Sequence, residues 1–175
     1  PVSLPALRGL LALLKAFDER FTQEKRRRHL LDFSDLEHCM IRLLTKKDTG
    51  APTAAARSLA QTYREILIDE YQDSNAVQEC IFQAVSREGK NLFLVGDVKQ
   101  SIYRFRLADP TIFLDKYARF ADFRAALPGA PRRILLRENF RSRRAVLEGA
   151  NHVFSNIMSR ALGELDYADA ARLRA

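Results

Sequence analysis

Several features that mark secreted, membrane or zinc-binding proteins are scarce or absent in this 175-residue sequence. Its two cysteines, Cys39 and Cys80, lie far apart and form no CxxC pair, so the sequence predicts neither a disulfide framework nor a metal knuckle. Both are expected to be small core residues in a reducing compartment. No apolar run approaches the ~20 residues that cross a bilayer, and no signal peptide opens the chain, so a cytoplasmic protein is expected.

The composition is typical of a globular protein with a basic surface. Hydrophobic residues make up 47% of the chain and charged residues 29%, which argues against an intrinsically disordered protein. The formal net charge is +7, so the surface favours a polyanionic partner. Charge alone does not establish such a partner, because many basic domains never bind nucleic acid.

Two continuous apolar runs predict the centre of the fold. Residues 65–69 and 91–95 each read as a strand buried on both faces, which is typical of central parallel strands. A helix expected over residues 75–86 connects them through short links. The order strand, helix, strand predicts a parallel βαβ unit, and a third strand is expected at residues 133–136. The predicted fold class is therefore α/β.

Helical spacing of apolar residues accounts for most of the remaining chain. The further expected helices cover residues 4–21, 35–45, 54–63, 109–120 and 142–158. Residues that can cap a helix precede three of the expected helices: Ser34, in a capping box with Glu37, then Asp73 or Ser74, and Ser142.

Two carboxylates, Asp69 and Glu70, stand at the carboxyl end of the first predicted strand. Open α/β sheets bind ligands at the carboxyl ends of their strands, so this pair is a candidate site. In nucleotide-hydrolysing proteins the first acid anchors magnesium, and the adjacent glutamate can act as general base toward the attacking water. An apolar strand followed by Asp-Glu is common, so the pair alone does not establish an ATPase.

The second predicted strand leads into a turn and then Gln100, whose uncharged amide can hydrogen-bond a γ-phosphate or the attacking water. Aromatic and basic residues then alternate from Tyr103 to Arg106. Bases of single-stranded nucleic acid stack on aromatic rings while guanidinium groups pair with phosphates, so this segment is a candidate single-strand contact. The alternative is that Tyr103 and Phe105 belong to the core and the arginines to the surface.

Arg141 follows the third predicted strand, on the loop that enters the last expected helix. An arginine at such a corner can reach a phosphate across a domain cleft, the arginine-finger role that is worth ~10³ to 10⁵ in rate. Taken by itself, the segment is only a charged loop.

Together and in this order, the segments DEYQDS, GDVKQSIYRFR and ENFRSR resemble consecutive motifs of the UvrD/RecB-type superfamily-one DNA helicases, and LLDFSDLE resembles the segment before them. KQSIYRFRLADPTIF and NHVFSNIMSRALGELDY are similar to the AddA family of bacterial helicase-nuclease subunits. The resemblance covers residues 17–167. It implies a RecA-like P-loop motor fold, with a helical segment over 1–53, part of the first motor domain over 54–131, and the start of the second over 132–175.

The resemblance also implies roles and partners. Asp69 would coordinate magnesium, Glu70 would activate water, Gln100 would contact the γ-phosphate, and Arg141 would complete the ATP site from the second motor domain. The residues that it implies along the single-strand track are Tyr103, Phe105 and Arg106. It further implies ATP and Mg²⁺ as cofactors, single-stranded and duplex-end DNA as substrate, an AddB-like partner, and 3′-to-5′ translocation in double-strand-break repair by recombination.

Three departures from the family pattern bear on these expectations. Phe105 stands where the family most often has Trp, and Leu107 replaces the usual Gly. No GxxxxGK[ST] loop occurs, since Gly89-Lys90 is followed by Asn and lacks the earlier Gly. The RecB-type nuclease domain expected at the end of an AddA chain is also absent from these residues. The chain alone is therefore expected to be inactive as an ATPase, although the intact parent should be active.

Two alternatives remain open at this point. One is a non-catalytic module, derived from a helicase, that only binds DNA or protein; the retained Asp69, Glu70, Gln100 and Arg141 argue against it. The other is a metal-dependent nuclease built on four acids and independent of ATP. Its candidate ligands are Asp69, Glu70, Asp73 and Asp97.

Overall fold

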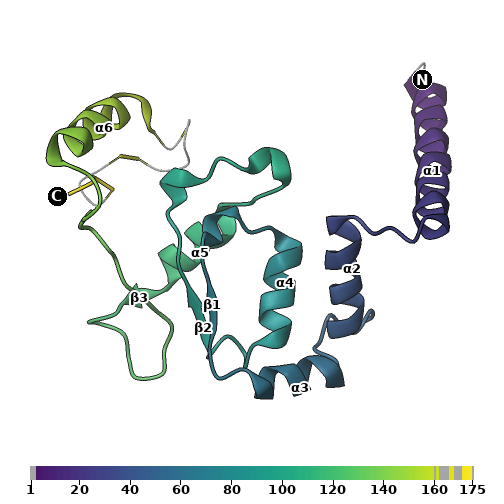
Figure 1. Ribbon diagram of the computed structural model, residues 1–175, viewed down its shortest axis with the longest axis horizontal. Coiled ribbons are helices and arrows are strands. Elements are labelled where there is room, and N and C mark those ends of the chain that lie inside the picture. The colour runs from purple at the N-terminus through teal and green to yellow at the C-terminus, as the bar shows by residue number, and fades with distance from the viewer. Residues whose placement is uncertain (1–2, 160, 162–165, 168–170, 175) are drawn as a thin grey trace.

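The computed structural model describes residues 3–159, 161, 166–167 and 171–174 (Figure 1). Part of the tail segment that resembles AddA, namely residues 160 and 162–165, lies outside the described residues. The helices are α1 (Ser3–Arg27), α2 (Phe33–Leu44), α3 (Ala54–Thr62), α4 (Ala76–Val85), α5 (Thr111–Arg119) and α6 (Arg144–Ile157), with short 3₁₀ turns η1 (Tyr71–Asp73), η2 (Val98–Gln100) and η3 (Arg104–Arg106). The strands are β1 (Ile66–Ile68), β2 (Leu92–Leu94), β3 (Ala121–Asp122) and β4 (Arg132–Arg133).

The predicted βαβ unit is confirmed. β1 pairs in parallel with β2, in the register Ile66 to Leu92 through Ile68 to Leu94, and α4 connects them. The fold class is thus α/β, as predicted. The expectation that both strands are buried on both faces is wrong for this chain, because Leu67 is 69% exposed. Successive side chains of a strand point to opposite faces, so the described elements cover only one face of this sheet.

The helical core lies beside the sheet. Leu44 of α2, Ala56 of α3 and Ala84 of α4 are buried together, and α4 stands between the sheet and α2 in Figure 1. Thr53 caps α3 by accepting a hydrogen bond from the Ala56 N–H, and its hydroxyl donates to the Leu43 carbonyl (2.8 Å). This cap stabilises the corner between α2 and α3.

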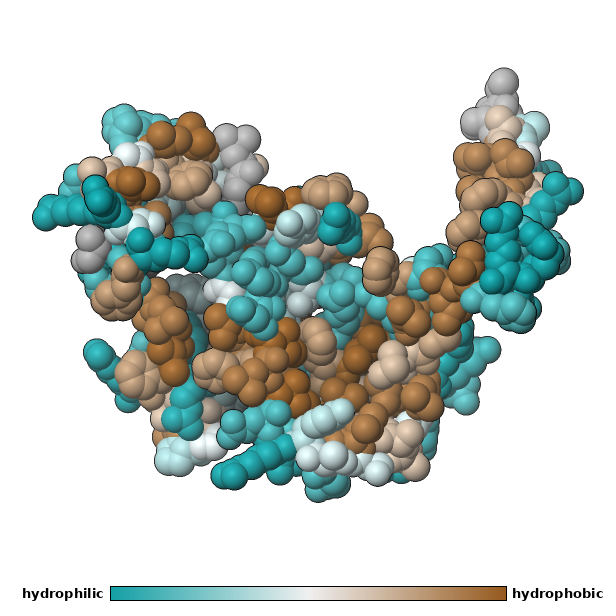
Figure 2. Space-filling view, in the orientation of Figure 1, coloured by the Kyte–Doolittle hydropathy of each residue, from teal (hydrophilic) through white to brown (hydrophobic). Residues whose placement is uncertain are grey.

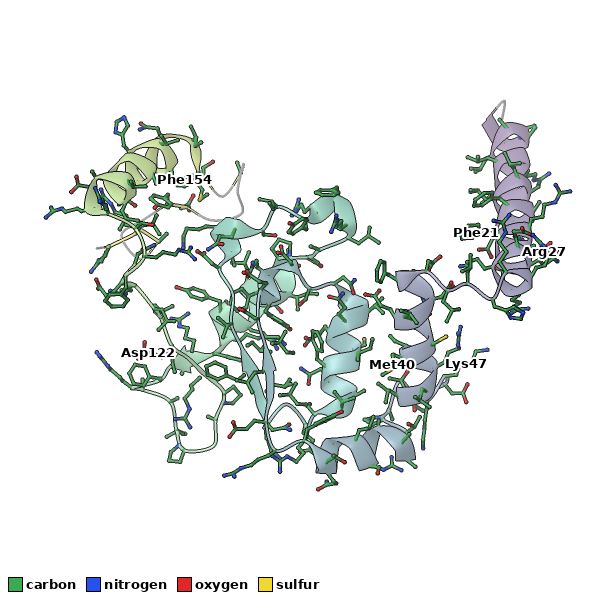
Figure 3. All side chains as sticks on the ribbon, in the orientation of Figure 1. Phe21, Arg27, Met40, Lys47, Asp122 and Phe154 are labelled. Carbon is green, nitrogen blue, oxygen red and sulfur yellow. The ribbon has the colours of Figure 1, made fainter. Side chains whose placement is uncertain are left out.

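Helix α1 projects from the body at one end of the molecule, and α6 lies at the other end (Figure 1). Figure 3 places Phe21 on the flank of α1 turned toward the rest of the protein and Arg27 on the opposite flank. An ionic cluster ties α1 to α2, because Lys25 Nζ lies 2.9 Å from Asp32 and 2.7 Å from Asp35. The hydrogen bonds from Lys25 lower the pKa of both aspartates.

The residues that cap the helices are not the ones predicted from the sequence. Asp32 caps α2 in a capping box with Asp35, and Asn75 caps α4 in a box with Gln78. The Ser34 hydroxyl is instead 3.2 Å from His38 Nδ1. At α6 the N-cap position is Arg143, which supplies no side-chain hydrogen bond. The predictions of caps at Ser34, at Asp73 or Ser74, and at Ser142 are therefore wrong.

Two other expectations about burial and strands are wrong. Cys39 and Cys80 are both exposed, although core positions were expected. The third strand is short: β4 covers only Arg132–Arg133 and pairs in parallel with β3 in a separate two-stranded sheet. Within the described part of the chain no strand pairs with residues 134–136. No helix of that same part is long and apolar enough to span a membrane.

Apolar residues remain visible on the surface. Figure 2 shows brown patches over the middle of the body and along α1. On α1 the large apolar residues that are exposed are Leu4, Leu7, Leu10, Leu11, Leu13, Leu14, Phe17 and Phe21. An apolar surface of this extent is typical of a segment that packs against further protein.

Candidate functional site

Hydrogen bonds beyond the paired residues hold the carboxyl ends of β1 and β2 together. Val95 N donates to the Ile68 carbonyl (2.8 Å), and Tyr71 N donates to the Val95 carbonyl (2.8 Å). The acids after β1 and the turn after β2 therefore lie at one edge of the sheet. This is the edge at which open α/β sheets bind ligands.

Asp69 and Glu70 are exposed at this edge. Asp69 Oδ1 accepts a hydrogen bond from the Glu70 N–H (2.9 Å), which fixes the first carboxylate against the turn. Glu70 has φ 50° and ψ 38°, a left-handed conformation that costs a non-glycine residue roughly 1–2 kcal/mol. Such outliers concentrate at functional sites. Its carboxylate accepts a hydrogen bond from Gln72 Nε2 (2.7 Å).

A magnesium ion that arrives with a nucleotide fits this donor set. Such an ion takes one or two protein carboxylates and completes its shell with phosphate oxygens and water. Asp69 supplies one exposed carboxylate at the strand end, as that arrangement requires.

The donor set does not fit a nuclease centre made of protein ligands. Among the described residues, no three His, Cys, Asp or Glu side chains come together as metal ligands. Asp97 is paired with Lys99 Nζ (2.8 Å). Asp73 has a buried Oδ1 with no hydrogen-bond partner in the described chain, and burial and then the charge of Glu70 raise its pKa. The nuclease alternative therefore gains no support from the geometry.

Gln100 lies at the end of η2, which follows directly from the turn after β2. Asp97 organises this loop: its Oδ1 accepts from the Lys99 N–H (3.1 Å) and its Oδ2 from Gln100 Nε2 (3.2 Å). Gln100 is exposed, so its amide can bind a ligand at the sheet edge when its hydrogen bond to Asp97 is broken.

Tyr71 holds the turn after β1 against the interior of the protein. No sequence pattern indicated this role. It is buried, its ring meets Phe113 of α5 edge-on at 5.6 Å, and its hydroxyl donates to Glu79 of α4. Burial and then Glu79 raise the pKa of Tyr71. Lys116 of α5 also pairs with Glu79 (2.7 Å). The turn that carries Glu70 therefore rests on two helices.

The aromatic and basic segment forms a surface cluster. The rings of Tyr103 and Phe105 lie 5.9 Å apart, and the Arg106 guanidinium lies 5.3 Å from the first ring and 5.6 Å from the second. Phe105 is 76% exposed. Because both rings are exposed, the alternative that they belong to the core of this chain is not supported.

Leu107, which directly follows η3, has φ 67° and ψ 16°, so it holds the left-handed conformation that favours glycine. Its side chain is 79% exposed and contributes little packing. The helicases that this segment resembles usually carry Gly at the same position, which agrees with the conformation.

Leu107→Gly is expected to raise the free energy of unfolding by about 0.5–1 kcal/mol. The relief of roughly 1–2 kcal/mol of left-handed strain is partly offset by the greater unfolded-state entropy of glycine. Urea unfolding of this chain measures the difference. Leu127→Gly is the matched control, since Leu127 is similarly exposed and has no positive φ. Equal destabilisation by both substitutions would show that Leu107 is not strained.

Arg141 is exposed in the loop before α6. The Asn139 side chain organises this loop, because its Oδ1 accepts from the N–H groups of Arg141 (3.0 Å) and Ser142 (2.8 Å). In the described part of the chain no hydrogen bond joins Arg141 to Asp69, Glu70 or Gln100. The structure thus brings the acids and the Gln100 loop together and leaves Arg141 outside that group.

Residues 8–121 match the UvrD/REP helicase N-terminal domain. The chain belongs to this family. It is 47% identical, over 98% of its length, to the AddA subunit of the ATP-dependent helicase/nuclease from Clostridium acetobutylicum, and it spans 14% of that protein. The AddA proteins of Listeria innocua and Desulforudis audaxviator are 46% and 48% identical over 97% of the chain, which again spans 14% of each. This UvrD/REP segment is thus about one-seventh of the length of such relatives.

Proposed function

We propose that this UvrD/REP-family chain is the part of an ATP-dependent DNA helicase, AddA-like as its relatives' names suggest, that holds magnesium and responds to the γ-phosphate. The observation that carries the proposal is the shared edge of β1 and β2, where Asp69 and Glu70 lie beside the loop of Gln100. In a RecA-like motor that edge faces the nucleotide. Residues 54–131 would belong to the first motor domain, residues 1–53 to a helical segment before it, and residues 132–175 to the second.

Each residue has a task that its geometry permits. Asp69 would hold Mg²⁺ through its free carboxylate oxygen, and the ion would neutralise charge on the phosphates of ATP. Glu70 would accept the proton of the attacking water, held in place by its left-handed turn. Gln100 would exchange its bond to Asp97 for one to the γ-phosphate. Arg141 would reach the phosphates only when the two motor domains close, which agrees with its position outside the group.

The substrate in this proposal is DNA with a single-stranded tail, bound along Tyr103, Phe105 and Arg106. Bases would stack on the exposed rings while Arg106 pairs with phosphate. By analogy with the AddA family, the intact parent would move 3′ to 5′ with an AddB-like partner, in the cytoplasm, during double-strand-break repair by recombination.

Strand separation by the intact parent tests this function. The assay uses the parent because the GxxxxGK[ST] loop is not in these 175 residues. With Mg²⁺ and ATP, the parent is expected to unwind a duplex with a 3′ tail and to spare one with a 5′ tail, and a non-hydrolysable ATP analogue should abolish unwinding. Unwinding without hydrolysis, or manganese-dependent DNA cutting at Asp69 and Glu70 without nucleotide, would contradict the motor assignment.

A further inference from the structure

Gln72 is a buried polar residue in the middle of the site, and the sequence patterns assigned it no role. It is 1% exposed and lies in η1, two residues after Glu70. Its Nε2 donates to Glu70 Oε2 (2.7 Å), and its Oε1 accepts from the Asp97 N–H (2.9 Å). One amide therefore connects the acid after β1 with the backbone after β2.

The chemistry of the two partners sets the orientation of this amide. A backbone N–H can only donate, so the atom that faces Asp97 must be the amide oxygen. The NH₂ group then faces Glu70, whose carboxylate is an acceptor. Of the residues of this length, glutamate lacks the donor and methionine lacks both groups. Gln72 is thus suited to hold an ionised carboxylate and a backbone N–H at once.

Gly96 lies beside the Gln72 amide and, because it has no side chain, leaves room for that amide. A Cβ at Gly96 would lie 2.6 Å from Gln72 Oε1, which is closer than a Cβ approaches another heavy atom without a shift of one of them. The Ser101 hydroxyl is also 3.5 Å from the Gln72 carbonyl oxygen. The Asp97 N–H before η2 and the Ser101 hydroxyl after it are therefore both in contact with Gln72.

We propose that Gln72 is a positioning residue: it orients the Glu70 carboxylate and ties that orientation to the loop that carries Gln100. The inference rests on the proposed function, because it takes Glu70 as the base and Gln100 as the group that meets the γ-phosphate. A shift of the loop when Gln100 binds its ligand moves the Asp97 N–H. Through the Gln72 amide, that shift reaches Glu70.

Gln72→Glu in the intact parent tests the role. The new carboxylate can still accept from the Asp97 N–H, but it places a negative charge against Glu70. The single-turnover rate of ATP hydrolysis is expected to fall about 10- to 100-fold, less than the ~10²- to 10⁴-fold that a general base contributes. The Kd of the nucleotide should stay within about threefold, because a group that acts on the chemical step changes rate and not binding.

Gln78→Glu is the matched control. Gln78 has the same two kinds of bond, since its Oε1 accepts from the Asn75 N–H (3.3 Å) and its Nε2 donates to Glu37 (2.9 Å), but it lies outside the site. Its substitution creates a similar pair of carboxylates and should leave the hydrolysis rate unchanged.

A double variant separates positioning from a general structural effect. If Gln72 acts through Glu70, then Gln72→Glu should cost nothing further in the Glu70→Gln background. Full additivity of the two losses would overturn the inference. So would a Gln72→Glu variant with the wild-type rate alongside an inactive Glu70→Gln variant. If Glu70→Gln itself keeps the wild-type rate, the proposed function is contradicted. That outcome differs from the outcomes that contradict the role of Gln72.

Gly96→Ala is the second variant, for use if Gln72→Glu does not fold. Its methyl group would lie 2.6 Å from Gln72 Oε1 and 3.1 Å from both Gln72 N and Phe113 Cε1, so it would displace the amide end of Gln72 from Asp97 without removing any polar group. The same loss of hydrolysis rate with retained nucleotide binding is expected. A wild-type rate in folded Gly96→Ala would overturn the inference.

Discussion

Glu70→Gln in the intact parent is expected to lower DNA-stimulated ATP hydrolysis by about 10²- to 10⁴-fold, the usual contribution of a general base. Nucleotide binding should be nearly unchanged, because glutamine keeps the size of the side chain and Glu70 is not the proposed magnesium ligand. The hydrogen bond from the backbone N–H at position 70 to Asp69 does not depend on the side chain and should persist. Phosphate release measures turnover, and a fluorescent ATP analogue measures affinity.

Asp69→Ala should show the opposite pattern at the binding step. Loss of the carboxylate that holds magnesium should weaken nucleotide binding, and more magnesium should restore part of it. For the Glu70→Gln variant the matched control is Glu88→Gln. Glu88 is an exposed glutamate with a positive φ of 56°, like Glu70, but it lies away from the sheet edge. Equal loss of binding in the Asp69 and Glu70 variants, with turnover retained, would show that the assigned roles are wrong.

The location of this site was predictable from the sequence. Two apolar runs joined by one helix predict parallel strands, and parallel strands end at the same edge. Polar residues at the carboxyl end of each run, Asp69 and Glu70 in one case and Asp97 in the other, therefore had to lie close together. The register of β1 against β2 and the hydrogen bonds of Tyr71 and Val95 confirm this part of the prediction.

The exact caps were not predictable, because several polar residues near each helix start can serve as the N-cap. Ser34 has the capping-box pattern, but Asp32 gains an additional ion pair with Lys25 and begins α2 two residues earlier. Before α6, Asn139 holds the N–H groups of Arg141 and Ser142 in the loop, and α6 begins only at Arg144, so Arg143 and not Ser142 stands at the N-cap position. Local patterns locate a helix to within a few residues, and contacts with other elements decide its start.

The burial of individual side chains and the contacts of buried polar groups could also not be predicted from the sequence pattern. An apolar run such as that around Leu67 predicts a face that can be buried, but it does not say what covers it. Gln72 stands between Tyr71 and Asp73 in DEYQDS, and nothing in that pattern distinguishes it. Its role depends on the approach of the Asp97 N–H, which only the folded arrangement of β1 and β2 reveals.

Phe105→Ala in the intact parent is expected to weaken affinity for single-stranded DNA by roughly 5- to 150-fold, since stacking of a base on an aromatic ring is worth ~1–3 kcal/mol. The ring is available for such stacking because it is 76% exposed beside Tyr103. The loss should show little sequence preference, as every base has a π-face. The salt dependence of binding should stay nearly the same, because no phosphate contact is removed.

Arg106→Ala should change the salt dependence instead. If the guanidinium that lies over both rings pairs with one phosphate, its loss should lower the slope of log affinity against log salt by about one unit. Phe123→Ala is the matched control for Phe105→Ala, because Phe123 is also an exposed ring with an arginine, Arg124, 5.3 Å from its centre. Salt titrations of single-strand binding compare the three variants with the wild type. Normal DNA binding by a folded Phe105→Ala protein would place the DNA track elsewhere.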